Sequence, residues 1–307
     1  MVETSIPKGI TSTLIVLIPK KPNPSMFADF RPISLCTFVN KIFTKVLANR
    51  LRAILPGIIS QEQSAFCPGR DIAENVLLAQ EMVASINRKG LNARVVDGSV
   101  AHYAMPRGCV RVTHLAFADD IVIFARGDRR SVGNLIRFLM LYQTGAGQRI
   151  NKQKSFFLMS RWCGAGQIRQ IQHLTGFRHG SFPFPYLGCN FYAGHRKKEF
   201  FHFLIEKFVA KLAGWQKKLL SQGGRLILIK HVLSAISLHV LAVMDPPKQV
   251  LKSLERVMAK FLWGQSDFGS KHHWCSWKNL CYPIFEDGLG IRGFEDMQGA
   301  FSCKLWW

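Results

Sequence analysis

The sequence predicts an α+β protein, because short β-rich runs and long helical stretches occupy different parts of its 307 residues. The β-rich runs lie in the first half, and most of the second half shows a helical apolar period. Proline- and glycine-containing breaks separate these segments, and we find no internal repeat and no low-complexity tract. A chain of this length can bury a sizeable core and hold two or three domains. We therefore expect a small sheet confined to the first half and a mostly helical remainder.

The first half contains one predicted strand and two predicted helices. Thr13–Ile18 is typical of a strand, which Pro19 ends. The apolar spacing within Asn40–Leu55 predicts a helix that stops at Pro56-Gly57. A second helix is expected over Asp71–Ile86, with the Asp71 side chain as its cap. From Lys89 to Arg111 no period is sustained, and we predict no regular element there.

The elements after residue 111 begin with a β-hairpin, Val112–Phe124, described below. They continue with a helix over Ser131–Gln143, a strand over Phe156–Met159, and helices at about Ala165–Leu174, Lys198–Trp215, Arg225–Val243 and Lys248–Trp263. Asp245-Pro246-Pro247 is a firm break between the last two helices. The run Leu226–Met244 is the most apolar, but Lys230, His231 and His239 interrupt it. We therefore expect a buried helix and no membrane partner.

The charge of the chain predicts a polyanionic partner. Lysine and arginine total 41 against 19 acidic residues, a formal net charge of +22. The basic residues are dispersed over the chain, which suits a folded groove better than a disordered arm. Nucleic acid is the expected partner, with salt-dependent binding; an anionic membrane surface is the minor alternative. Eight scattered cysteines without a CxxC pair, and no signal peptide at Met1–Gly9, predict an intracellular protein with reduced thiols.

The segment Phe117-Ala118-Asp119-Asp120 carries the strongest chemical signal. It lies between the apolar runs Val112–Ala116 and Ile121–Phe124, a pattern that predicts a tight hairpin with two carboxylates at its tip. Two adjacent carboxylates on rigid strands can bind Mg²⁺ together with substrate phosphates. Two-metal nucleotidyl transfer uses such a pair with a further carboxylate from another strand. From these residues alone, a metal site and a simple turn cap are both open.

Runs in the same order along nearly the whole chain resemble the reverse transcriptase of plant non-LTR (LINE-type) retrotransposons. Besides the Phe-Ala-Asp-Asp segment, they are Leu17–Lys21, Asp29–Cys36, Leu47–Leu51, Ile59–Phe66, Pro68–Arg70, Gly147–Ser155, Tyr186–Gly188, Leu212–Gln216 and Trp274–Cys281. The resemblance implies a right-hand polymerase fold with incomplete fingers and palm and a mostly helical thumb. We assign fingers to residues 1–90, a remnant palm to 91–160, a thumb-like region to 161–245 and a Trp-rich helical segment to 246–307. The implied activity is RNA-directed DNA polymerisation with Mg²⁺, an RNA or DNA template–primer and dNTPs.

The resemblance also assigns site residues. It maps Asp119 and Asp120 onto the metal-binding palm carboxylates. Arg31, in the Arg-Pro-Ile-Ser-Leu segment, is a candidate phosphate contact, with an ion pair to Asp29 as the alternative. Lys154 is a candidate triphosphate contact, with a solvated turn lysine as the alternative. The expected nucleic-acid-binding residues also include Lys20, Lys21 and Arg70.

Two palm elements of the family are missing from this sequence. Family members carry a Lys-Leu-Asp-Met-like strand with the first metal-binding aspartate, and later a Gln-Gly-Asp-Pro-Leu-Ser-Pro box. We find neither, and we expect a truncated chain with a palm block excised between about Gly90 and Ala101. Asp97 does not replace the missing ligand, because Gly98 follows it and it lies too near the hairpin. We therefore predict a catalytically defective polymerase; a non-catalytic nucleic-acid-binding remnant and a relic without a selected role are the alternatives.

Two further groups have simpler interpretations. His272, His273, Cys275 and Cys281 could be metal ligands, but their spacing is not that of a zinc knuckle. Cysteines buried beside aromatic rings are the better interpretation. Asp128 is expected to be a turn residue paired with arginine.

Overall fold

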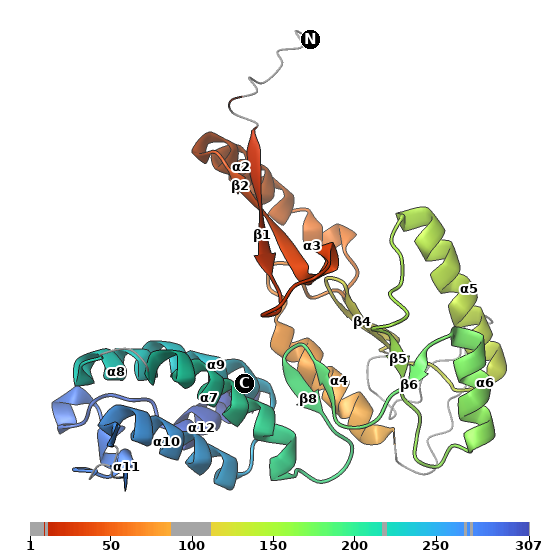
Figure 1. Ribbon diagram of the computed structural model, residues 1–307. Coiled ribbons are helices and arrows are strands. Elements are labelled where there is room, and N and C mark those ends of the chain that lie inside the picture. Colours follow the sequence, from red (N-terminus) through yellow and green to blue (C-terminus); the bar gives the residue numbers. More distant parts are fainter. Residues whose placement is uncertain are drawn as a thin grey trace. The chain divides into compact units, whose positions relative to one another are not determined.

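The computed structural model describes residues 9, 12–86, 112–216, 220–266, 269–270 and 273–306. Helices account for 54% of it, and all five sheets of the described residues have two strands (Figure 1). The α+β class is therefore confirmed. The chain divides into two compact units, residues 1–70 (unit 1) and 71–307 (unit 2). Each unit is described by itself.

Unit 1 is a β-hairpin followed by helices. Its elements are β1 (Thr13–Pro19), η1 (Phe27–Asp29), β2 (Phe30–Cys36), α2 (Phe38–Arg52) and α3 (Leu55–Ile58). β1 pairs antiparallel with β2, with Ile18 opposite Arg31. The Thr37 side chain caps α2 by accepting a hydrogen bond from the Asn40 amide. No side chain of β1 or α2 is buried, so these apolar faces enclose no core of their own.

Unit 2 begins with the elements that hold the Asp-Asp hairpin. They are α4 (Ile72–Ser85), β3 (His114–Phe117), β4 (Asp120–Ile123), α5 (Arg129–Ala146), β5 (Phe156–Phe157), α6 (Ala165–Thr175), β6 (Arg178–His179), β7 (Phe184–Tyr186) and β8 (Cys189–Phe191). Asp71 caps α4 by accepting from the Ala73 amide, as predicted. The buried face of α4, including Val76 and Ala79, belongs to the core of unit 2.

The rest of unit 2 is mostly helical, as expected. It comprises η2 (Lys198–Phe201), α7 (His202–Gln216), α8 (Gln222–Leu228), η3 (Ile229–Leu233), α9 (Ser234–Val243), α10 (Lys248–Trp263), β9 (Gln265–Ser266), β10 (Gly269–Ser270), α11 (Trp277–Leu280), η4 (Ile284–Glu286) and α12 (Phe294–Trp306). η3 is a π-helical turn between α8 and α9, and the Ser234 hydroxyl donates to the Ile229 carbonyl across it at 3.0 Å. β5 lies within the strand expected over Phe156–Met159, whereas β6 to β10 correct the expectation that the sheet is confined to the first half.

One core runs through unit 2. Phe191, Phe201, Phe208 and Phe294 are among its fully buried side chains. Within the described residues, the helical stretch Gln222–Val243 is long and apolar enough to cross a membrane by length and composition. Its side chains at Ile229, Leu233 and Val240 are buried in the core, as expected of an internal helix. The absence of a membrane partner stays a prediction.

Candidate active site

The two predicted metal-binding carboxylates lie at the tip of the β3–β4 hairpin. Phe117 pairs with Asp120, so Ala118 and Asp119 form a two-residue turn and Asp120 begins β4. Both aspartates are exposed. Cross-strand partners share a face of a sheet, and this places Asp120 on the same face as Leu115 and Val122. Because Leu115 is buried and Val122 packs against the core, the carboxylate of Asp120 stands where that face meets solvent.

The turn itself holds an unfavourable backbone conformation. Ala118 has a φ of 55°, a region in which residues other than glycine are uncommon. Two-residue hairpin turns favour glycine, asparagine or aspartate at such positions. Strained residues cluster at functional sites, so this outlier is consistent with a site.

Helix α4 fixes the hairpin through one buried side chain. The Phe124 amide donates to the Thr113 carbonyl at 2.8 Å, and alternation of the antiparallel ladder makes Ala116–Ile121 a non-hydrogen-bonded pair. The Ala116 carbonyl therefore points away from β4. Asn75, which is buried, donates its side-chain amide to that carbonyl at 2.9 Å. The hydrogen bond attaches the strand before the carboxylates to α4.

Tyr186 lies close enough to Asp120 to respond to its charge, a relation that the sequence did not reveal. Burial, and secondarily the negative charge of Asp120, raises the pKa of Tyr186 to about 12. Its hydroxyl has no hydrogen-bond partner among the described residues. Tyr186 ends β7, and the turn to β8 that follows has positive φ at Leu187 and Gly188. The only sequence signal was its place in the Tyr-Leu-Gly run.

The described residues do not complete a two-metal centre. They contain no group of three or more histidine, cysteine, aspartate or glutamate side chains that could hold a metal ion. Mg²⁺ binding with two exposed carboxylates would depend on substrate phosphates and water for its other ligands. Asp97 lies outside the described residues, as does the proposed excision site. The described residues thus do not supply the ligands of the paired metal ions that the sequence resemblance implies.

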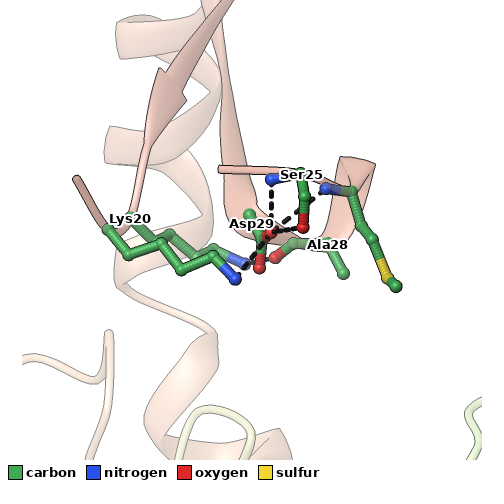
Figure 2. Close-up of polar contacts among 6 residues, drawn as sticks. Lys20, Ser25, Ala28 and Asp29 are labelled. Carbon is green, nitrogen blue, oxygen red and sulfur yellow. Dashed lines mark hydrogen bonds and ion pairs between the residues drawn. The ribbon is translucent and has the colours of Figure 1, made fainter. Parts of the chain in front are cut away.

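Three predicted nucleic-acid-binding residues of unit 1 meet at one end of the β1–β2 hairpin. Lys20 donates its ammonium to the Ala28 carbonyl at 2.8 Å (Figure 2), and Lys21 forms an ion pair with Asp29 at 2.9 Å. Hydrogen bonds from Lys21 and from the Ser25 and Met26 amides hold the pKa of Asp29 well below its usual range. The alternative pairing of Arg31 with Asp29 is therefore wrong, because Lys21 takes that place. Arg31 is exposed and available to a ligand.

Arg70 has a structural role in unit 1. Its guanidinium donates to the Ile59 carbonyl at 3.0 Å and also to the carbonyls of Ser60 and Gln63. These bonds use three of its five N–H donors within the loop that precedes α4. Nucleic-acid contact by Arg70 stays a prediction, and it would have to compete with three backbone acceptors.

The remaining candidates lie in unit 2. Lys154 is exposed in a turn, where the Asn151 side chain accepts a hydrogen bond from its backbone amide. This matches the alternative of a solvated turn lysine, and a phosphate contact stays a prediction.

Asp128 forms an ion pair with Arg126 at 3.3 Å and caps α5. Cys275 and Cys281 pack against the core, and burial, then Glu255 and Asp296, raises the pKa of Cys281 to about 11. The two thiols are therefore partly buried against the core; His272 lies outside the described residues.

Comparison with known proteins gives a ribonuclease H-like relative and two relatives named for mobile elements. No protein-family model matches the chain. The chain is 34% identical over 110 residues to a putative ribonuclease H protein of Arabidopsis thaliana, covering 36% of this chain and 18% of that protein. It is 21% identical to the transposon TX1 uncharacterized 149 kDa protein of Xenopus laevis, covering 97% of this chain and 29% of that protein.

A third relative is the retrovirus-related Pol polyprotein from the type-1 retrotransposable element R2 of Nasonia vitripennis. The chain is 33% identical to it over 93 residues, which cover 30% of this chain and 9% of the polyprotein. The chain thus spans less than a third of the length of each relative. Together the three similarities support an origin in a non-LTR retrotransposon and a reverse-transcriptase-like ancestry.

Proposed function

We propose that the chain is a reverse-transcriptase-like retrotransposon fragment that binds nucleic acid and is defective in polymerisation. The observation that carries the proposal is the Asp119–Asp120 pair, exposed on a strained hairpin tip without a third metal ligand among the described residues. In the parent reaction, metal ions neutralise developing charge and position the attacking hydroxyl. With a ligand missing, the protein does not firmly coordinate the metal ion that activates that hydroxyl.

The proposed loss of a palm block has support from one comparison. The match to the transposon TX1 protein extends over 387 aligned positions, whereas 97% of the 307 residues of this chain is about 298. The alignment therefore needs many positions at which this chain has no residue. An internal deletion in this chain would produce such an excess of aligned positions over residues. Sequencing the transcript across codons 88–102 tests it, since an intervening aspartate-containing strand would overturn the deletion.

The catalytic part of the proposal is tested by primer extension with Mg²⁺ or Mn²⁺. We expect the chain to extend a primer no more than its Asp119→Ala variant does. Robust extension that the substitution abolishes would show a working centre and refute the proposed defect. A parallel reaction with the metal ion chelated gives the background.

The binding part rests on charge. The excess of 22 positive charges predicts that affinity for RNA or DNA falls steeply with salt, because each phosphate contact releases counterions. Filter binding of a labelled strand over a salt series measures this slope. A flat salt dependence would favour the alternative, a relic without a selected role, over a binding protein.

A further inference from the structure

The helical part of unit 2 contains a basic pocket that is lined by residues outside the Asp-Asp hairpin. Its volume is about 360 Å³, and it lies between the η2–α7 segment and α10. Lys198 and His202 line one wall, and Lys252 and Arg256 line the other. None of the lining residues is acidic.

The geometry of the two walls explains why these side chains converge. Lys252 and Arg256 are four residues apart on α10 and therefore share one face of that helix. The opposite face of α10 is fixed in the core through Leu251, Leu254 and Met258. The basic face is thus held toward the segment that carries Lys198 and His202.

No ion pair of the described residues neutralises the basic side chains of the pocket. The ion pairs of the described residues join Lys21 to Asp29, Arg126 to Asp128, and Arg196 to Asp245. None of these includes a basic side chain of the pocket. Glu255 of α10 responds to the charge of Lys252 as well as to Glu295 and Asp296 of α12, so it offsets part of the charge of one pocket wall.

The polar groups that remain for a ligand are the basic side chains and the side-chain amide of Gln249. The Ser253 hydroxyl at the pocket already donates to the Gln249 carbonyl at 2.8 Å. Lysine, arginine and histidine side chains are hydrogen-bond donors to phosphate oxygens, and arginine can donate two parallel bonds. No phenylalanine, tyrosine or tryptophan ring lines the pocket, and the His202 imidazole is the one aromatic ring among its lining residues.

We propose that this pocket binds phosphate groups of a nucleic-acid backbone, in a contact that does not depend on base sequence. The inference rests on the proposed nucleic-acid binding and extends it to named residues. A site with basic groups on two walls and no phenylalanine, tyrosine or tryptophan ring suits contact with the phosphates of a strand that passes through it. A free polyphosphate offers the same oxygens, and the experiment distinguishes the two.

The test compares two double variants of the full chain that lose the same charge. Lys252→Gln with Arg256→Gln removes one wall of the pocket. Lys207→Gln with Lys211→Gln removes two exposed lysines from α7, outside this pocket, and serves as the matched control. Each protein is titrated with a labelled single-stranded RNA between low and moderate salt, and thermal melting verifies that each is folded.

The pocket variant is expected to reduce the log–log salt slope by about 1.4, since a single-strand phosphate contact contributes about 0.7. The control is expected to lower affinity slightly with a smaller change of slope. Equal slopes for the two variants would overturn the pocket assignment, because general charge would then account for binding. If the pocket variant does not fold, Lys198→Gln on the opposite wall provides the same comparison, with an expected reduction of the log–log salt slope of about 0.7.

Inorganic tripolyphosphate separates the two sources of phosphate. Backbone binding predicts that the pocket substitutions change the RNA slope, whatever their effect on tripolyphosphate. A loss of tripolyphosphate binding with an unchanged RNA slope would refute the backbone contact. A wild-type chain without salt-dependent RNA binding would instead refute the proposed function, so the two failures are distinguishable.

Discussion

Replacing Asn75 by alanine should loosen the carboxylate hairpin from the helix beneath it. The Asn75 side chain is buried and donates to the Ala116 carbonyl at 2.9 Å, a group that the β3–β4 ladder cannot satisfy. The substitution removes a hydrogen bond with a net value of about 1 kcal/mol and leaves a buried carbonyl unpaired at a cost of about 1–3 kcal/mol. We expect the Asn75→Ala variant to lose about 2–3 kcal/mol of unfolding free energy.

Thermal and urea unfolding followed by circular dichroism measure this loss. For a folded unit of this size, about 2 kcal/mol corresponds to a fall in Tm of about 4–8 °C. Glu81→Ala is the matched control, because Glu81 is exposed on the same helix and its removal should change stability by less than about 0.5 kcal/mol. An Asn75→Ala variant as stable as the control would refute the role of this hydrogen bond.

Three further substitutions test the surroundings of the site. Tyr186→Phe removes a buried hydroxyl that has no partner in the described structure, and should stabilise the protein by about 1 kcal/mol in urea unfolding; a loss of that size would mean that the hydroxyl is satisfied. Ala118→Gly relieves a φ of 55° and should gain up to about 1 kcal/mol, whereas a clear loss would show that alanine fits this turn. Burial, and then the negative charges of Glu295 and Asp296, raises the pKa of Glu255 above its ordinary value of 4.5. The contribution of this group to the free energy of unfolding is therefore present at low pH and is lost as pH rises through its folded pKa. Glu255→Gln should flatten that part of the stability profile, measured as Tm from pH 4 to 8, and an unchanged profile would contradict the assignment.

Local patterns were sufficient to predict most helices and the Asp-Asp hairpin. Helix α4 was found from its apolar period and its Asp71 cap, both of which depend on neighbours in sequence. Strand β2 was not predicted, because Pro32 within the run argues against a central strand. It is accommodated here in a two-stranded sheet, where it lies opposite Leu17.

The contacts of the site depend on residues distant in sequence and were therefore harder to predict. The carboxylates of Asp119 and Asp120 follow from the hairpin pattern alone. The influence of Asp120 on Tyr186 requires the packing of β7 against the hairpin region, which no periodicity reports. The pairing of Lys21 rather than Arg31 with Asp29 depends on how the connection between β1 and β2 folds back.

The most direct measurement of the central claim is primer extension at protein concentrations that saturate binding of the labelled template–primer. Saturation ensures that a lack of product reflects chemistry and not weak binding. We expect a bound template–primer with no Mg²⁺-dependent extension above that of an Asp119→Ala, Asp120→Ala variant. Extension that rises with Mg²⁺ and disappears in that variant would contradict it.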